Sequence, residues 1–260
     1  DVFKQLKDAG MINIGFGLES INNTILKSLK KGITADQINT ALKAAYDAKV
    51  SINGNFLLGD PAETVATAND TIEWWIKHKE FHTNLGIGNR IIAYPGTPIY
   101  RKDVSDGIIK NRVKFLEDGC PVVNVSKNMD EKDYLYLRCK LHKIRKNSRY
   151  LSVGEVLFSR KTGSQNGQNI YTLKIQCPHC NAINEYLECW QDVDDFSIFT
   201  TAACKNRECC QSFRVRCKKA FPKNYKAIIK TTVYNVLKSI YTTFYIAKYE
   251  LMNGKKVRYG

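Results

Sequence analysis

Four cysteines fall into two short pairs whose spacing is typical of a metal-binding site. The pairs are Cys177 with Cys180 and Cys204 with Cys209, and both lie among short β-like runs. Four thiolates bind Zn²⁺ as a closed tetrahedron that stabilises a fold and leaves no open position for a substrate. The spacing therefore predicts a structural zinc site with these four ligands, and free thiols in a reducing compartment are the alternative. Cys210 offers a fifth thiol, so the fourth ligand is either Cys209 or Cys210.

Three polar signatures elsewhere in the chain each follow a short apolar run. They are residues 17–20, 59–64 and 94–98, after apolar runs at 11–16, 51–58 and 85–93. A strand, a polar turn and a helix in repeated order predict consecutive βα units of a parallel sheet or barrel. In such folds the residues just past the carboxyl ends of the strands form the ligand site. We therefore expect these three turns to converge on one pocket.

The chemistry of each signature allows a binding role and a purely structural one. Glu19 and Ser20 can accept hydrogen bonds from sugar hydroxyls or an ammonium group, or Ser20 can simply cap a helix over 21–31. Gly59 allows a flat ligand to approach backbone amides, or it belongs to a plain strand-to-helix turn. Tyr94 lies beside a rigid proline turn, where most tyrosines simply pack.

Local signals predict the helices that follow these turns. Thr34 and Gln37 have the spacing of a capping box. Asp60 is expected to be the N-cap of the next helix, with Pro61 at its first position. A further helix is expected from Asp130 to about residue 145.

The basic character of the chain is concentrated at its end. The 260 residues have a net charge of +15, and residues 201–260 contain 14 Lys and Arg against two Glu. The last element, 224–253, is expected to be a basic amphipathic helix, with apolar residues at helical spacing: Tyr225, Ile229, Val233, Val236, Ile240, Phe244, Ala247 and Leu251. It could pack on the barrel with its Lys face in solvent, lie on an anionic membrane surface, or bind nucleic acid together with the cysteine module.

In combination, the three signatures resemble a known family. Residues 13–20, 54–64 and 93–100, in this order, are similar to the second half of the radical SAM barrel. The nearest likeness is to the branch often fused to a cobalamin-binding domain. The resemblance covers about residues 1–145, including 119–124, and implies a partial (β/α)6 TIM-like barrel. Such a barrel binds S-adenosylmethionine (SAM) and a [4Fe–4S] cluster.

The resemblance also implies roles for individual residues. By position, Glu19 and Ser20 reach the ribose or methionine end of SAM, the run from Asn55 to Gly59 lies along the adenine, and Tyr94 lines the pocket. The sequence departs from the family pattern at two points, with Asn55 where Gly is common and the acid one place late at Glu63. No catalytic residue is identified.

The cluster-binding motif of the family, CxxxCxxC, does not occur in this sequence. Three thiolates that leave one iron open are needed for SAM to chelate the cluster. Because the chain opens where the family's fourth strand is about to begin, we expect the missing half to lie upstream and this fragment to be inactive alone.

These inferences give an α/β protein with four parts. Residues 1–110 are expected to be the C-terminal half of the barrel, 111–147 a helical connection, 150–218 a zinc-ribbon-like module and 224–253 the basic helix. The expected function of the complete protein is reductive cleavage of SAM, with radical or cobalamin-assisted methyl transfer to a small-molecule or lipid-like substrate. A flavodoxin or ferredoxin is the expected reductant, and the protein is expected in the cytoplasm, peripheral at a membrane if the helix binds one. The alternative is a non-catalytic nucleic-acid or membrane-surface binding module built on the ribbon and the basic helix.

Overall fold

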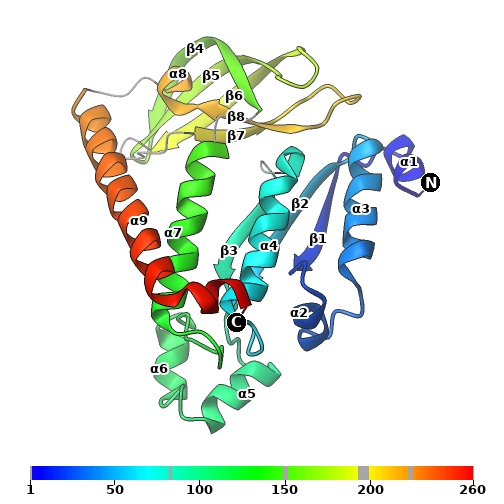
Figure 1. The fold of residues 1–260 in the computed structure, drawn as a ribbon. Helices are drawn as coiled ribbons and strands as arrows, with labels where there is room; N and C mark the ends of the chain where they lie inside the picture. Colours follow the sequence, from blue (N-terminus) through cyan, green and yellow to red (C-terminus); the bar gives the residue numbers. More distant parts are fainter. Residues whose placement is uncertain (1, 82–83, 149–151, 193–198, 222–224, 260) are drawn as a thin grey trace.

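The first half of the chain is built on a small parallel sheet. The computed structural model describes all residues except 1, 82–83, 149–151, 193–198, 222–224 and 260. Strands β1 (Asn13–Glu19), β2 (Ser51–Leu58) and β3 (Leu85–Arg90) pair in parallel in the order β1-β2-β3. The predicted repeat of parallel βα units is thereby confirmed for three strands (Figure 1).

Helices cover one face of this sheet. They are α1 (Val2–Asp8), α2 (Asn23–Ser28), α3 (Ala35–Asp47), α4 (Val65–Lys77) and the 3₁₀ turn η1 (Lys79–Phe81). The main core lies between the sheet and these helices, where Phe56, Leu42 and Ile72 are fully buried. The predicted capping box of Thr34 and Gln37 is confirmed at the start of α3.

The opposite face of the sheet carries small and polar residues. Its members lie exposed at alternate positions of β1 and β2: Asn13, Gly15, Gly17, Asn53 and Asn55. No helix of the described chain packs on these five residues, which together define the uncovered face. All-parallel sheets normally bury both faces under apolar side chains, so this face is unusual in composition and in exposure.

Two helix starts differ from the sequence expectation. The helix expected over 21–31 is the short α2, and its N-cap is Asn22 rather than Ser20. The helix expected from Asp60 begins at Val65, where Thr64 is the N-cap of a capping box. Asp60 instead accepts a hydrogen bond from the Ala62 amide at 2.8 Å within a tight turn. The buried carboxylates of Asp60 and Glu63 accept hydrogen bonds from Ser28 and from the Gly59 amide. Neither therefore caps α4, and Thr64 is its N-cap.

A helical segment joins the two sheets. It contains α5 (Pro98–Ser105), α6 (Arg112–Glu117) and α7 (Glu131–Ser148), of which α6 and nearly all of α7 lie in the segment 111–147 that was expected to be a helical connection. Asp130 and Asp133 begin α7 as predicted, since Asp130 accepts hydrogen bonds from the amides of Lys132 and Asp133.

The second sheet forms the ribbon module, residues 153–221. Its strands are β4 (Val153–Gln165), β5 (Gln168–Gln176), β6 (Ile183–Asp192), β7 (Phe199–Ala203) and β8 (Ser212–Arg216), in the order β6-β5-β4-β8-β7. The short helix α8 (Cys217–Ala220) follows, and Phe213 and Ile175 lie at the centre of the module's own core. The sequence predicts β-like runs at 155–158, 170–175, 196–201 and 212–215 in this module, and none of them corresponds to β6. Residues 196–198 of the third run lie outside the described residues.

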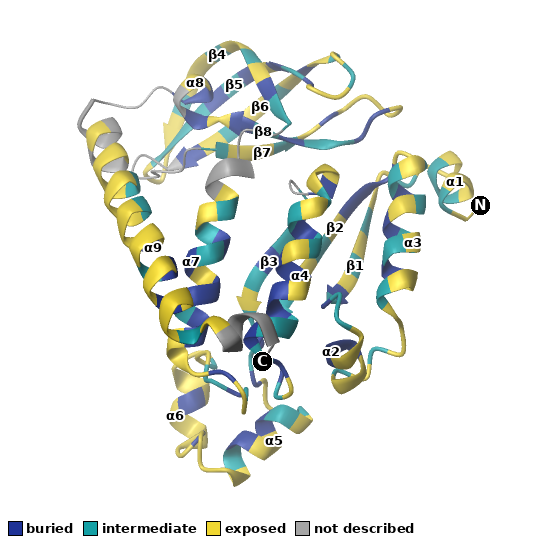
Figure 2. Ribbon diagram, viewed as in Figure 1, coloured by how far each residue is buried: buried dark blue, intermediate teal, exposed yellow. Residues whose placement is uncertain are grey.

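The last helix, α9 (Tyr225–Tyr259), packs against α7 and α4. The sequence suggested that the stripe containing Ile229, Ile240 and Phe244 would pack inward if the helix docked on the barrel. That expectation is wrong, because the helix docks through its other face and these side chains are exposed (Figure 2). Within the described residues, no helix combines the length and the apolar character needed to cross a membrane.

The start of α4 provides a test of the fold. Replacing Thr64 with Ala removes the side-chain acceptor for the Thr67 amide, so we expect the free energy of unfolding to fall by about 1 kcal/mol. Thr40→Ala, which changes an exposed threonine inside α3, is the matched control and should have a smaller effect. Urea denaturation measures both, and an equal loss in the two variants would contradict the placement of the cap.

Candidate functional site

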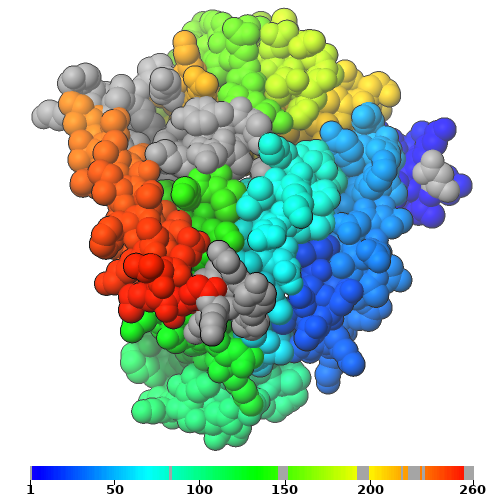
Figure 3. Space-filling view, viewed as in Figure 1, coloured from blue at the N-terminus to red at the C-terminus, as the bar shows by residue number. Residues whose placement is uncertain are grey.

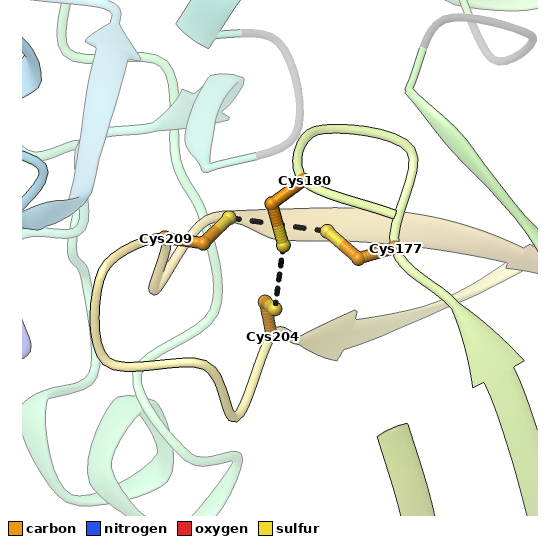
Figure 4. A group of neighbouring side chains, drawn as sticks. All are labelled: Cys177, Cys180, Cys204 and Cys209. Carbon is orange, nitrogen blue, oxygen red and sulfur yellow. Dashed lines mark hydrogen bonds between the residues drawn. The ribbon is translucent and has the colours of Figure 1, made fainter. Parts of the chain in front are cut away.

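The four cysteines of the two sequence pairs come together in the ribbon module. The sulfur atoms of Cys177, Cys180, Cys204 and Cys209 all lie within 4.8 Å of one another (Figure 4). The Cys180–Cys204 sulfur distance is 3.6 Å and the Cys177–Cys209 distance is 3.9 Å. A tetrahedron with metal–sulfur bonds of about 2.3 Å has edges of about 3.8 Å. The spacing of these sulfurs therefore fits a tetrahedral metal ion, and we call these residues the cysteine group.

Two matching turns position the cysteine group. The first pair lies in the connection between antiparallel strands β5 and β6, and the second pair lies between antiparallel strands β7 and β8. Asn181 and Cys210, which directly follow the two pairs, both have left-handed backbones, with φ of 61° and 52°. This conformation turns the chain back so that an amide points toward a sulfur, as the Ala182 amide does toward Cys180. The His179 amide, within the first pair, also donates to the Cys177 sulfur at 3.4 Å.

The structure distinguishes the two candidates for the fourth ligand. Cys209 belongs to the cysteine group, whereas the thiol of Cys210 lies 3.2 Å from the Arg207 carbonyl oxygen and 3.1 Å from the Lys7 ammonium. Cys210 therefore occupies the left-handed position of the turn, where Gly is common, and its sulfur points away from the other four.

Burial favours the protonated form of two members of the cysteine group, Cys204 and Cys209. Burial is the largest cause that raises the pKa of Cys204 to about 11 and raises the pKa of Cys209 further. Burial also opposes ionisation of Cys180, but hydrogen bonds from the Ala182 amide and neighbouring thiols lower its pKa overall. A bound cation would have to displace protons, so metal affinity should increase with pH.

The cysteine group lies at the amino-terminal side of the parallel sheet. Lys7 of α1 donates hydrogen bonds both to Cys210 and to the carbonyl oxygen of Lys49, which lies two residues before the start of β2. The eight residues of β2 extend over roughly 25 Å before the chain reaches Gly59. The candidate metal centre and the polar turns after the strands are therefore at opposite ends of the sheet (Figure 1).

At the carboxyl end of β1, Glu19 and Ser20 face different surroundings. Glu19 has a left-handed backbone (φ 61°), and its carboxylate forms a partly exposed ion pair with Lys31 at 3.2 Å. Ser20 is fully buried, and its hydroxyl lies 3.2 Å from the hydroxyl of Thr71 on α4. The Glu19 carboxylate is accessible from solvent, whereas Ser20 fixes the backbone that carries it.

Asn55 lies on the uncovered face, beside β3. Its partner on the neighbouring strand β3 is Gly86. A β-carbon added at Gly86 would lie 2.1 Å from Oδ1, the side-chain amide oxygen of Asn55. Gly86 therefore allows the Asn55 amide to lie across the sheet. On the same face, the side-chain amide of Asn53 donates to the side-chain oxygen of Asn13 at 3.1 Å. The uncovered face therefore carries several asparagine amide groups beside glycines that have no side chain.

Gly59 is buried and faces the interior of the protein. Its amide donates to the carboxylate of Glu63 at 2.5 Å, and a methyl group at this position would lie 2.8 Å from the Tyr134 hydroxyl. Gly59 has φ of 98°, a conformation that favours glycine. Its requirement for glycine thus comes from the turn and from the close approach of α7.

Glu63 is the residue whose environment the sequence did not reveal. It is 1% exposed, and its second carboxylate oxygen, Oε1, has no hydrogen-bond partner among the described residues. Burial raises the pKa of Glu63 to about 7, with a further contribution from the charge of Asp60, while the Gly59 amide opposes the shift. From the sequence, Glu63 was expected in the first turn of a helix that starts at Asp60. The helix starts only at Val65, so Glu63 lies in the buried turn before it.

Beyond β3, an aromatic and ionic contact joins the sheet to α7. Arg90 stacks on the ring of Tyr134 at 3.8 Å and binds both carboxylate oxygens of Glu131 at 3.1 Å. Because Arg90 and its partners are about forty positions apart in the chain, no local pattern could have indicated the contact. Tyr94, in the turn that follows, is 55% exposed.

The structure therefore divides the five residues assigned to SAM in two groups. Glu19, Asn55 and Tyr94 are accessible to solvent, whereas Ser20 and Gly59 are buried. Glu19, Ser20, Asn55 and Gly59 lie on or directly after β1 and β2, and Tyr94 lies four residues past the end of β3.

Comparison with known proteins gives two partial matches. The chain is 30% identical over 108 residues to the uncharacterized methyltransferase PH0819 of Pyrococcus horikoshii. It is 30% identical over 108 residues to the bacteriochlorophyllide d C-8(2)-methyltransferase of Chlorobaculum tepidum. Each match covers about two fifths of this chain, 42% and 41%, and 23% of the relative. The chain thus spans about a quarter of the length of these relatives, and no family model matches it.

Among solved structures, the chain has a distant likeness to the archaeal Elp3 of Methanocaldococcus infernus with an N-terminal deletion. The TM-score is 0.35 and the identity 11%, over 69% of this chain and 51% of the other. A TM-score of this size does not establish a common fold.

The assignment of the fourth thiol leads to a direct prediction. Cys209→Ser should weaken the binding of Co²⁺, used as a tetrahedral probe, by more than about 100-fold, because it removes a ligand of the ion. Cys210→Ser is the matched control and should change the affinity by less than about threefold. Optical titration measures both. Equal losses in the two variants, or an unchanged affinity in Cys209→Ser, would contradict the assignment of Cys209 as the fourth ligand.

Buried Glu63 predicts a pH dependence of stability. Its pKa is raised from the ordinary value of 4.5 to about 7, so between these values the folded state binds more protons than the unfolded state. The free energy of unfolding should therefore fall as the pH rises, by up to about 3 kcal/mol, and the effect should be complete above pH 7. Glu63→Gln should flatten this decline, whereas Glu80→Gln, at an exposed position, should leave it unchanged. Parallel slopes for wild type and Glu63→Gln in denaturant titrations would contradict the prediction.

Proposed function

We propose that this chain contributes half of the barrel of a radical SAM methyltransferase. The observation that carries the proposal is the 30% identity to two proteins named as methyltransferases. The order of the three signatures around 19–20, 55–64 and 94–98 supports the radical SAM class in particular. SAM, when bound, supplies either its methyl group or, after one-electron cleavage, a 5′-deoxyadenosyl radical. Cobalamin is an additional cofactor of the complete protein in this proposal.

The uncovered face supports a binding role for the sheet. A barrel closes its strands around an interior lined by alternate residues, and in this sheet those alternate residues are Gly15, Gly17, Asn53 and Asn55. Glycines leave room for a ligand near the backbone, and amides supply hydrogen bonds for orientation. The Glu19 carboxylate at the end of β1 can accept two hydrogen bonds from ribose hydroxyls. Glu19 and Asn55 are therefore the residues of this chain that we assign to SAM.

The [4Fe–4S] cluster requires ligands from outside these 260 residues. The sequence has no CxxxCxxC motif, and the cysteine group lies at the opposite end of the sheet from Glu19. The cysteine group also has four sulfurs within 4.8 Å of one another, which suits a closed site with no position for SAM. We assign it to Zn²⁺ in a structural role, because a small module with its own limited core gains stability from a metal.

SAM binding provides the test of this proposal. We expect SAM to bind this chain saturably and to slow amide hydrogen exchange in residues 13–20 and 51–59. Glu19→Gln should weaken the affinity about tenfold, because it removes a charged hydrogen-bond acceptor worth about 1.5 kcal/mol.

Asp47→Asn is the matched control. Asp47 also forms an ion pair, with Lys43 at 2.6 Å, but on an exposed part of α3. This variant should bind SAM as the wild type does. Undetectable binding at about 1 mM SAM, or the same affinity for wild type and Glu19→Gln, would overturn the assignment.

A further inference from the structure

Helix α9 turns mainly polar and aromatic side chains toward the protein and most of its large aliphatic side chains toward solvent. The residues that face α7 recur every three or four positions and include Thr242, Tyr245 and Tyr249. Tyr249 stacks on Tyr136 of α7 with ring centroids 4.3 Å apart, and its hydroxyl donates to the carboxylate of Asp133. Hydroxyl groups, aromatic rings and the buried side chain of Ile246 therefore hold the helix in place, and its exposed aliphatic side chains are not needed for docking.

Apart from Ile246, the large aliphatic side chains of α9 whose burial is described lie on its outward side. The exposed fractions of Ile240, Phe244 and Leu251 are 63%, 68% and 87%. The outward stripe comprises these residues with Ile229, Val233, Val236, Leu237 and Met252, all of them more than 45% exposed. A stripe from 229 to 252 extends about 35 Å along the helix. Contiguous apolar surface of this length marks an interaction site in a stable protein.

The position of α9 leaves the outward stripe accessible along its length. The helix lies along an outer edge of the molecule, between the ribbon module and the end of the sheet (Figures 1 and 3). Its contacts with α7 and α4 are on the side away from the stripe. A flat surface could therefore contact the helix over several turns at once.

Charge and aromatic residues indicate what kind of surface fits. Residues 225–260 contain seven Lys and Arg and a single acid, Glu250, which accepts a hydrogen bond from the Tyr136 hydroxyl at 3.0 Å. One flank of the outward stripe carries Tyr234, Lys238, Tyr241 and Lys248 at helical spacing, all exposed, and the Lys238 ammonium lies 5.5 Å from the centre of the Tyr234 ring. Tyrosines and lysines beside an apolar stripe are typical of helices that lie at the boundary between lipid headgroups and acyl chains.

Other occupants fit these features less well. A second copy of the chain would bring two basic helices together, and like charges across an interface are unfavourable. Nucleic acid binds through rows of Lys and Arg, but the centre of this surface is aliphatic. An anionic bilayer satisfies both properties, since the acyl chains accept the stripe and the headgroups pair with the lysines.

We propose that α9 attaches the protein to an anionic membrane surface through its outward stripe. The helix lies parallel to the membrane and does not cross it, which agrees with the finding that no helix in the described part of the chain is apolar enough to span one. The proposal is independent of the methyltransferase assignment, because it rests only on α9.

Vesicle sedimentation tests the proposal with the full chain. Vesicles of phosphatidylcholine with about 30 mol % phosphatidylglycerol should bind the protein at least tenfold more tightly than vesicles of pure phosphatidylcholine. The preference should weaken between about 50 and 500 mM salt. Ile240→Ser with Phe244→Ser should reduce binding to the anionic vesicles by more than about tenfold, since two apolar side chains no longer enter the lipid.

Matched variants identify the cause of any loss. Val113→Ser with Leu116→Ser removes two exposed apolar side chains from α6 and should leave vesicle binding unchanged. Lys238→Gln with Lys248→Gln should remove most of the preference for anionic lipid. Absence of vesicle binding overturns the proposal, as does a dimer in sedimentation equilibrium that Ile240→Ser with Phe244→Ser dissociates. Binding to RNA in preference to vesicles would overturn it as well.

Discussion

The arrangement of this protein depends on a parallel sheet of three strands that is covered on one side only. Phe56, Leu58 and Ile87 are buried beneath the helices, and their burial fixes which alternate residues of each strand point inward. The register then places Asn53 and Asn55 on the other face, because successive side chains of a strand point to opposite sides. The same constraint that builds the core therefore builds the uncovered face, and it makes this face polar and rich in glycine.

The turn after β2 shows how packing changes the role of local signals. Asp60 and Glu63 have the residue types and spacing of a helix start, yet both carboxylates are buried and α4 begins only at Val65. Ser28 donates to Asp60 at 2.7 Å and the Gly59 amide donates to Glu63. These contacts fix the backbone that links the sheet to its covering helices, and they bury an acid of raised pKa in the turn after β2.

The two ends of the sheet have different chemical character. The amino-terminal side meets the ribbon module, whose cysteine group suits a closed metal site and leaves no position for a substrate. The carboxyl side carries Glu19 and the turns that follow the strands, where ligands of parallel α/β folds usually bind. Helix α9 connects both ends along the outside, with its hydrogen-bonding side against α7 and its aliphatic side in solvent. The cysteine group, the proposed SAM site and the proposed membrane surface thus have separate locations in one chain.

The sequence by itself determined the parallel βα repeat, the capping box of α3, the two cysteine pairs that meet in the cysteine group and the helical nature of the last element. Each of these depends on residue types at short spacing, where local geometry leaves few alternatives. Tertiary structure decided that Cys209 rather than Cys210 joins the group, that Thr64 rather than Asp60 caps α4, and that the apolar stripe of α9 faces outward. Strand β6 and the stacking of Arg90 on Tyr134 were also beyond local patterns. The physical reason is common to these cases: a side chain's environment depends on which distant element packs against it, and helical spacing cannot tell which face of a helix the protein will cover.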